Sequence, residues 1–338
     1  MIKKSFYKNI IFYITLILIF FFVILYSLEI ALSFWNHSSL KAKKWKKLDR
    51  SRYSYYVMQK KINPEVVITI SPSNFVNDKN IEVYPLAGIH NSLTINCNEL
   101  GFWSKFNSDK FGFNNSNDDW NKDRYKFLLL GDSFLLGDCV NSSDNISNQL
   151  RKSLKETKKN DKYGVLNIGY GGNGSLIENA TLREYFPNAY VENVLLLYYD
   201  ANDLTEFFRE IKNPLLKKYL DDKNFKQNLV DKNFLVNKIL KEKLITLTKE
   251  EEEKIKKNKL IRFNEIRFNK LLILTNLRHR LTWQFNLPLI SDGGSPRVYE
   301  SHEVELIKKN FLQIQEFSKS KGSKFYFVFL PGFPAEND

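Results

Sequence analysis

YKFLLLGDSFLLGDCV, residues 125–140, is the stretch that decides the fold of this chain. Four apolar residues, Phe127–Leu130, are stopped by Gly131, Asp132 and Ser133. A short apolar run ended by Gly and Asp predicts a buried strand that enters a tight turn. In an open α/β sheet, ligands and chemistry collect at the carboxyl ends of the strands. Ser133 is therefore a candidate nucleophile, and a serine in an ordinary turn is the alternative.

The pattern of Phe127–Leu130 is repeated along the chain. Strands alternating with helices predict βαβ units, a parallel sheet and right-handed crossovers. The further predicted strands are Tyr163–Ile168, Val194–Tyr199 and Lys324–Leu330, and the predicted helices are Ser143–Glu156, Leu176–Tyr185, Asn202–Ile211 and Ser301–Ser320.

Charge and cysteine content exclude some classes of partner. The chain has 338 residues, with 51 Lys and Arg against 38 Asp and Glu, so its formal net charge is +13. Such a surplus fits nucleic acid, anionic membrane or an acidic polymer. No zinc-finger spacing, aromatic RNA-binding signature or long heptad run accompanies it, so nucleic-acid binding is not expected.

Cys97 and Cys139 form no CxxC pair, which argues against structural zinc. If the chain is exported we favour one disulfide over two free buried thiols.

The amino terminus predicts a membrane anchor. Residues 1–9 carry three lysines, and Ile10–Leu28 is an apolar run long enough to cross a bilayer as a helix. A cleaved signal peptide has a shorter apolar region, and Ala31-Leu32-Ser33 is only a weak cleavage site, so we predict an uncleaved transmembrane helix over residues 10–34. Charge counting alone favours a cytoplasmic body, because a basic cluster follows the span at residues 41–52.

The rest of the chain divides by composition. Residues 35–80 are expected to form a basic stalk or linker, or else a first edge element around the β-like run Val66–Ile70. Residues 81–338 then form the folded domain, which opens with a loop-rich lead-in to about residue 115. A Lys- and Glu-rich helical insertion interrupts it at about 212–295, and within it the apolar segment Leu271–Trp283 is expected to pack on the body or on the membrane.

Three predicted strands end in residues suited to one reaction. They are Gly131-Asp132-Ser133, the glycine cluster Gly169–Gly174, and Asp200-Ala201-Asn202-Asp203. In a parallel sheet these loops open on the same edge. A serine nucleophile needs backbone and side-chain donors around the oxyanion that it creates, and Gly and Asn supply them. Asn202 as a helix N-cap is the alternative, and Asp132, Asp138 and Asp203 are expected to be structural.

These three blocks resemble those of the SGNH/GDSL hydrolase family. Gly131-Asp132-Ser133 matches the nucleophile block, Asn167–Gly172 looks like the second block, and Asp200–Asp203 is similar to the third. The resemblance implies a three-layer α/β/α flavodoxin-like sheet with Ser133 as nucleophile, and with Gly172 and Asn202 as oxyanion donors. Gly169, Gly171 and Gly174 are the alternatives to Gly172. No metal or organic cofactor is implied.

The resemblance also implies a place and a substrate class. Together with the cysteines it puts the body outside the cytoplasm, as the periplasmic domain of a single-pass bacterial inner-membrane protein. The bilayer is then contacted through residues 10–34. The expected activity is an ester hydrolase or acetyltransferase that acts on O-acylated cell-envelope carbohydrate. A nucleotide-binding domain fits less well, because the glycine cluster lacks both GxGxxG order and a Walker lysine.

Two departures from the family matter. Asp200 stands where glycine is usual, and no Asp-x-x-His block, which supplies the base, follows Ser133. We therefore expect the chain to be truncated before that block. Each histidine is a poor candidate for the base; in particular, we expect the helix that His302 begins to start at the sheet edge opposite Ser133. The four histidines are His37, His90, His279 and His302. The alternative function is an inactive, membrane-tethered binding or scaffold protein on a degenerate fold of this type.

Overall fold

The computed structural model describes residues 2–38, 52–98, 102–158, 163–200, 202–261, 274, 277 and 300–332. The chain divides into two compact units, which are described separately. One consists of Met1–Asp49 and Glu251–Val298, and the other of Arg50–Glu250 and Tyr299–Asp338.

The first unit contains the long helix α1 (Ile2–Ser38). Within it, Asn9–Leu32 has a mean hydropathy of 2.8, and its side chains are almost all exposed. These 24 residues are long enough, at about 1.5 Å per residue, for a hydrocarbon core of about 30 Å. The helix expected over residues 10–34 is therefore present and suited to a membrane, and a signal sequence shares these properties. Of the apolar segment Leu271–Trp283, only Leu274 and Leu277 are described.

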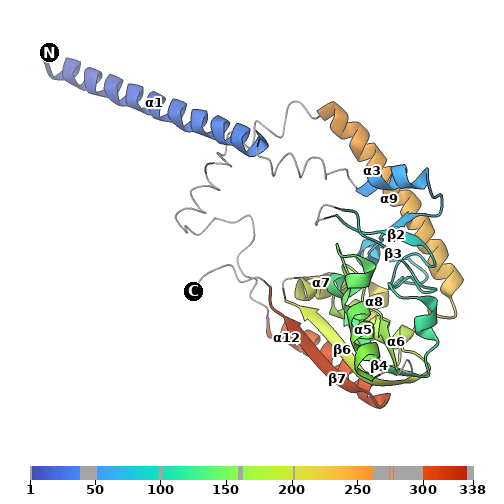
Figure 1. Ribbon diagram of the computed structural model, residues 1–338. Helices are drawn as coiled ribbons and strands as arrows, with labels where there is room; N and C mark the ends of the chain where they lie inside the picture. The colour runs from blue at the N-terminus through green and yellow to red at the C-terminus, as the bar shows by residue number, and fades with distance from the viewer. Residues whose placement is uncertain are drawn as a thin grey trace. The chain divides into compact units, whose positions relative to one another are not determined.

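The second unit is built on a four-stranded parallel sheet (Figure 1). Its strand order is β5-β4-β6-β7, and neighbouring strands pair in parallel throughout. All four predicted strands are confirmed, so the mixed α/β class with a parallel sheet is correct. The strands are β4 (Arg124–Gly131), β5 (Tyr163–Asn167), β6 (Tyr190–Tyr199) and β7 (Lys324–Leu330).

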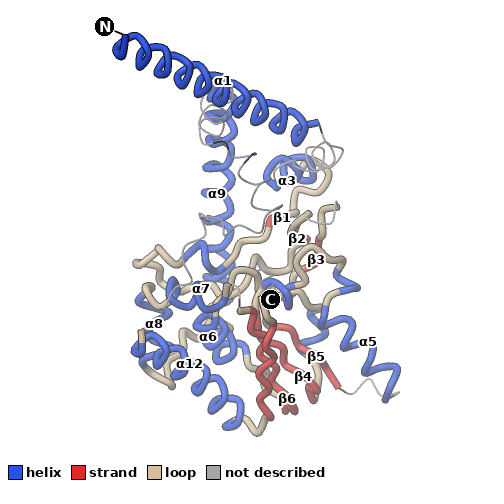
Figure 2. The backbone as a smooth tube through the Cα atoms, turned by 90° about the vertical axis from the view of Figure 1, so that its left-hand side faces the viewer, coloured by secondary structure: helices blue, strands red, loops and turns tan. Residues whose placement is uncertain are grey.

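Helices cover both faces of this sheet, as Figure 2 shows. One face carries α5 (Ile146–Lys158), and the other carries α6 (Ser175–Tyr185), α8 (Pro214–Asp221) and α12 (Ser301–Ser320). Side chains alternate along a strand, so β4 contributes to the apolar cluster on each face of the sheet. Leu129 packs with α5, and its neighbours Leu128 and Leu130 pack with the helices of the other face. Apolar runs of this kind are typical of strands buried on both faces.

The described part of residues 52–120, called the lead-in from here on, forms a small second sheet with short helices and is part of the folded body. The order in this sheet is β1-β2-β3, with β1 parallel and β3 antiparallel to β2. Val66, Ile70 and Phe75 are almost completely buried, so of the two expectations for residues 53–80 the structure has the packed element. The elements are α3 (Arg52–Lys60), β1 (Val67–Ile68), η1 (Pro72–Phe75), β2 (Leu93–Ile95), β3 (Lys105–Asn107) and η2 (Asn117–Trp120).

The insertion expected at about 212–295 is mainly helical where it is described, with an irregular segment at residues 222–232. It comprises α8 and α9 (Asn233–Ile261), and residues 262–273, 275–276 and 278–299 lie outside the described part. Val236, Leu240 and Leu244 recur every four residues of α9 and are buried against the body.

The remaining short elements are α4 (Ser133–Leu136), η3 (Ser142–Asp144) and α7 (Asp203–Glu210).

Candidate active site

Ser133 is the first residue of α4, directly after the end of β4. Gly131 is packed too closely for a side chain, because a Cβ there would lie 2.8 Å from the Leu197 carbonyl oxygen. Asp132 caps α4: its Oδ1 accepts the backbone N–H of Phe134 at 3.0 Å. The half-buried Ser133 donates its hydroxyl to Asp132 Oδ2 at 3.3 Å. The turn thus holds the serine at the carboxyl edge of the sheet.

The glycine cluster lies beside this turn. The backbone N–H of Tyr170 donates to the Gly131 carbonyl at 3.1 Å. The buried Asn167 amide donates to the Leu135 carbonyl at 2.6 Å and accepts the Gly169 N–H at 2.9 Å, which ties the end of β5 to the serine helix.

Gly172 is the member of the cluster with a conformation that requires glycine. Its φ is +77°, and a Cβ would lie 2.4 Å from Ser71 Oγ and 3.2 Å from Ser73 Oγ. The Ser71 and Ser73 hydroxyls are 2.7 Å apart and come from the lead-in, far away in sequence. The sequence indicated only a short β-like run at Val66–Ile70 just before these serines, so their place beside Gly172 was missed.

The third loop brings Asn202 to the same place. Asn202 occupies the N-cap position of α7, but its side chain makes no cap hydrogen bond, so the capping alternative is wrong for the side chain. Instead the Asn202 amide faces the Asp132 carboxyl and acts to lower the pKa of that group. The rings of Phe134 and Tyr199 also contact each other, with centroids 4.9 Å apart. All three strand-end loops therefore converge at the switch point of the sheet between β4 and β6, the position at which open α/β sheets bind ligands.

Four buried carboxyl groups form a cluster at the serine turn, and no sequence pattern predicted it. Asp132, Glu178, Asp203 and Glu210 are each at most 1% exposed. Every residue of α6, Glu178 among them, is buried. Asp203 accepts the Tyr199 N–H at 2.7 Å, whereas neither carboxyl oxygen of Glu178 has a hydrogen-bond partner. The sequence of α6 mixes polar and apolar residues, so it predicts a helix but does not show that all faces of that helix are buried.

Burial controls the ionisation of these carboxyls. It raises the pKa of Asp132, and it raises that of Glu178 further with help from the negative charge of Asp203. Burial and the charge of Asp132 raise the pKa of Asp203 to about 8. Burial also raises the pKa of Glu210 to about 8, although Glu210 accepts backbone N–H groups at the start of α6. Burial thus drives all four carboxyls toward their neutral form, and only for Asp132 does a neighbouring side-chain amide act in the opposite direction.

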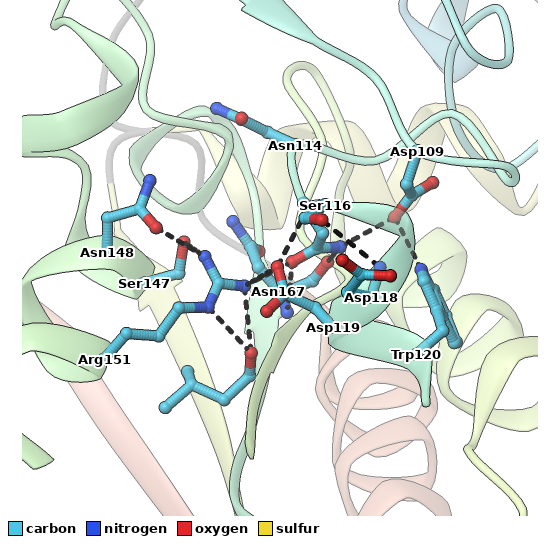
Figure 3. A network of polar contacts seen from close by, with 12 residues as sticks. Asp109, Asn114, Ser116, Asp118, Asp119, Trp120, Ser147, Asn148, Arg151 and Asn167 are labelled. Atoms are coloured by element: carbon cyan, nitrogen blue, oxygen red, sulfur yellow. Dashed lines mark hydrogen bonds and ion pairs between the residues drawn. The ribbon is translucent and has the colours of Figure 1, made fainter. Parts of the chain in front are cut away.

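The lead-in holds the site from outside through a polar network (Figure 3). Asp109, 1% exposed, accepts the Trp120 indole N–H at 2.7 Å and the Asn115 amide at 2.9 Å. Asn115 bonds to both the backbone N–H and the carbonyl of Asn167, and it accepts the Arg151 guanidinium at 2.8 Å. The network therefore fixes the end of β5, from which the glycine cluster follows.

A disulfide joins Cys97 of the lead-in to Cys139, six residues after Ser133, with Cα atoms 5.0 Å apart. This confirms the pairing that we favoured. Asp138 accepts the Asn96 amide at 2.7 Å, in keeping with the structural role expected for it. The described residues contain no group of three His, Cys, Asp or Glu side chains arranged to hold a metal ion.

No described histidine hydrogen-bonds to Ser133. His90 is buried against α9, where burial and Lys241 lower its pKa to about 4. His302 begins α12, and its Nδ1 lies 3.2 Å from Glu300 Oε2, with two thirds of the side chain exposed. His37 lies in α1, in the other unit, and His279 lies outside the described residues.

The position predicted for His302 was wrong. Helix α12 connects directly to β7 and runs antiparallel to it, so it begins at the edge where β7 ends. That edge is the one with Asn202, because the Asp200 N–H donates to the Leu330 carbonyl at 3.1 Å. Leu204, two residues after Asn202, and Val304 line one apolar groove. A crossover helix starts where the preceding strand ends, and the prediction had this direction reversed.

Comparisons with protein-family models, with curated proteins and with solved structures found no match to this chain. The function is therefore argued from the site. A serine hydroxyl in contact with a carboxylate, beside a glycine loop and a side-chain amide, is suited to attack on an acyl carbonyl.

Proposed function

We propose that the chain is a serine ester hydrolase or acyltransferase of SGNH type. The observation that carries the proposal is the convergence of Ser133, the Gly172 loop and Asn202 at one sheet edge. Numbered along the chain, the order of the parallel strands is 2-1-3-4, which is the order expected of a flavodoxin-like sheet. This order and the helices on both faces support the fold that the resemblance implies.

In the proposed reaction, Ser133 Oγ attacks the acyl carbon of an ester. The carbonyl oxygen then carries a negative charge, which needs donors aimed at it. The N–H groups of Ser133 and Gly172 and the Asn202 amide are the proposed donors. The amide of Asn202 has two hydrogens, so it is able to donate to the substrate while it faces Asp132. The acyl group then passes from Ser133 to water or to an acceptor hydroxyl.

The proposed substrate is O-acylated carbohydrate of the cell envelope. Helix α1 would keep the site close to a bilayer, and the Cys97–Cys139 disulfide favours an oxidising compartment outside the cytoplasm. We place the body in the periplasm of a bacterial inner-membrane protein on these two grounds.

A second candidate is a membrane-tethered binding protein on a degenerate fold of this type. One observation favours it: within the described part of the chain, no imidazole contacts Ser133 to serve as its base. In this case the loops would hold an acylated glycan without turning it over.

The test is hydrolysis of p-nitrophenyl acetate by the full chain in detergent micelles, together with labelling by a fluorophosphonate. We expect turnover that Ser133→Ala abolishes, and a phosphonyl adduct mapped to Ser133 by mass spectrometry. Ser143→Ala removes a hydroxyl from an exposed bond to Asp144 and is the matched control. Turnover unaffected by Ser133→Ala, or an adduct only elsewhere, would refute the hydrolase and favour the binding protein.

A further inference from the structure

The Ser133 hydroxyl already has a proton acceptor in contact with it. Its Oγ donates to Asp132 Oδ2 at 3.3 Å, while Asp132 Oδ1 is held by the Phe134 N–H at 3.0 Å. The carboxyl group is 1% exposed, so water does not compete freely for it. We propose that Asp132 is the general base that takes the proton of Ser133. This inference rests on the proposed function and gives a catalytic role to a residue that the sequence indicated to be structural.

The surroundings of Asp132 suit a base. The groups that face it are the Asn202 amide on the α7 side, the carboxyl of Asp203 at the start of α7, and Glu178 on α6. Glu210, at the end of α7, is the next carboxyl in the cluster. No lysine or arginine in the described residues is among the groups that shift its pKa. A buried carboxylate without a cationic partner binds a proton more tightly than an exposed one.

The neighbouring carboxyls also influence one another's ionisation. Burial, followed by the negative charge of Asp132, raises the pKa of Asp203, and burial with the charges of Asp203 and Asp132 raises that of Glu178. Asp132, the member of the cluster that touches the nucleophile, therefore lies beside carboxyls that favour their neutral form.

The proton follows a balanced path. As Ser133 Oγ bonds to the acyl carbon, its proton passes to Asp132 Oδ2, and the carbonyl electron pair moves onto oxygen. When the oxyanion collapses, the bond from the acyl carbon to the leaving oxygen breaks, and Asp132 returns the proton to that oxygen. Water or an acceptor hydroxyl then attacks the acyl-serine, again giving its proton to Asp132, and Ser133 recovers its own. No oxidant, reductant or metal enters this sequence.

Asp132→Asn in the full chain in detergent is the main test. Asparagine keeps the oxygen that caps α4 but does not accept a proton, so kcat/KM for p-nitrophenyl acetate should fall about 10²–10⁴-fold. The wild-type rate should rise with pH through one carboxyl ionisation and then level off, and the variant should lose this inflection. Asp144→Asn, which makes the same change at an exposed helix turn, is the control. Variant activity within threefold of wild type, with an unchanged pH profile, would overturn the inference.

A second variant covers the case in which Asp132→Asn does not fold. Asp132→Ala leaves space for a small carboxylate, and sodium formate should then raise its Ser133-dependent rate at least about tenfold. Absence of rescue in a folded Asp132→Ala protein overturns the inference. If turnover depends on Ser133 but not on Asp132, only this inference fails. If no turnover depends on Ser133, the proposed function fails as well.

Discussion

Gly172→Ala tests whether the glycine loop has the conformation that the proposed oxyanion site needs. At φ +77° an alanine costs about 1–2 kcal/mol relative to glycine. The new Cβ would also lie 2.4 Å from Ser71 Oγ, a hydroxyl that accepts the Ser73 N–H and so caps η1. Displacing this hydroxyl costs the cap, about 0.5–2 kcal/mol. We therefore expect Gly172→Ala to destabilise the domain by about 2–4 kcal/mol.

The measurement is the melting temperature of the full chain in detergent, followed by near-ultraviolet circular dichroism. For a domain of this size, about 2–4 °C is lost per kcal/mol, so a decrease of about 4–16 °C is expected. Gly171→Ala is the matched control. It is the adjacent glycine, it does not have positive φ, and its added Cβ would meet Leu136 Cδ2 only at 3.3 Å.

The double variant Ser71→Ala/Gly172→Ala separates the two costs. Ser71→Ala removes the hydroxyl that the new Cβ would displace, so the double variant should be less destabilised than the sum of the single ones by about 1 kcal/mol. The backbone cost should remain. Equal melting temperatures for Gly171→Ala and Gly172→Ala would refute the left-handed conformation, and strict additivity would refute the contact with Ser71.

Three further outcomes are expected. The melting temperature should fall from pH 5 to pH 9, because the pKa of Glu210 is raised from 4.5 to about 8, so that its contribution to stability is complete below pH 4.5 and lost as pH rises through 8. The pKa of Glu178 is raised as well, so Glu178→Gln should weaken this fall in melting temperature. An unchanged fall in the variant would contradict the prediction. Reduction of the Cys97–Cys139 bond should cost about 2–4 kcal/mol in wild type and nothing in Cys97→Ser/Cys139→Ser, as denaturant titration with dithiothreitol would show. Asn167→Ala should cost about 1–3 kcal/mol by leaving buried backbone groups unpaired, and a wild-type unfolding midpoint would rule this out.

Local sequence was sufficient for the elements of the main sheet. Strand β7 occurs at Lys324–Leu330 and helix α12 at Ser301–Ser320, as predicted, because a short apolar run and an apolar face at helical spacing are local signals of a strand and a helix. The position of the three loops that carry Ser133, Gly172 and Asn202 at one sheet edge also followed from sequence, since parallel strands end at one edge. The apolar span within α1 was equally readable, because a bilayer requires an uninterrupted apolar helix.

The sequence alone did not determine the surroundings of the site. Ser71 approaches Gly172 across about a hundred residues of chain, and the Cys97–Cys139 pairing was one of two alternatives until the lead-in was placed. Glu178 lies on a helix that α7, α8 and α12 enclose, so its burial depends on packing partners distant in sequence. Such contacts arise only when the elements are assembled. Periodicity reports which face of an element avoids water, whereas the ionisation of a carboxyl group depends on everything that surrounds it in three dimensions.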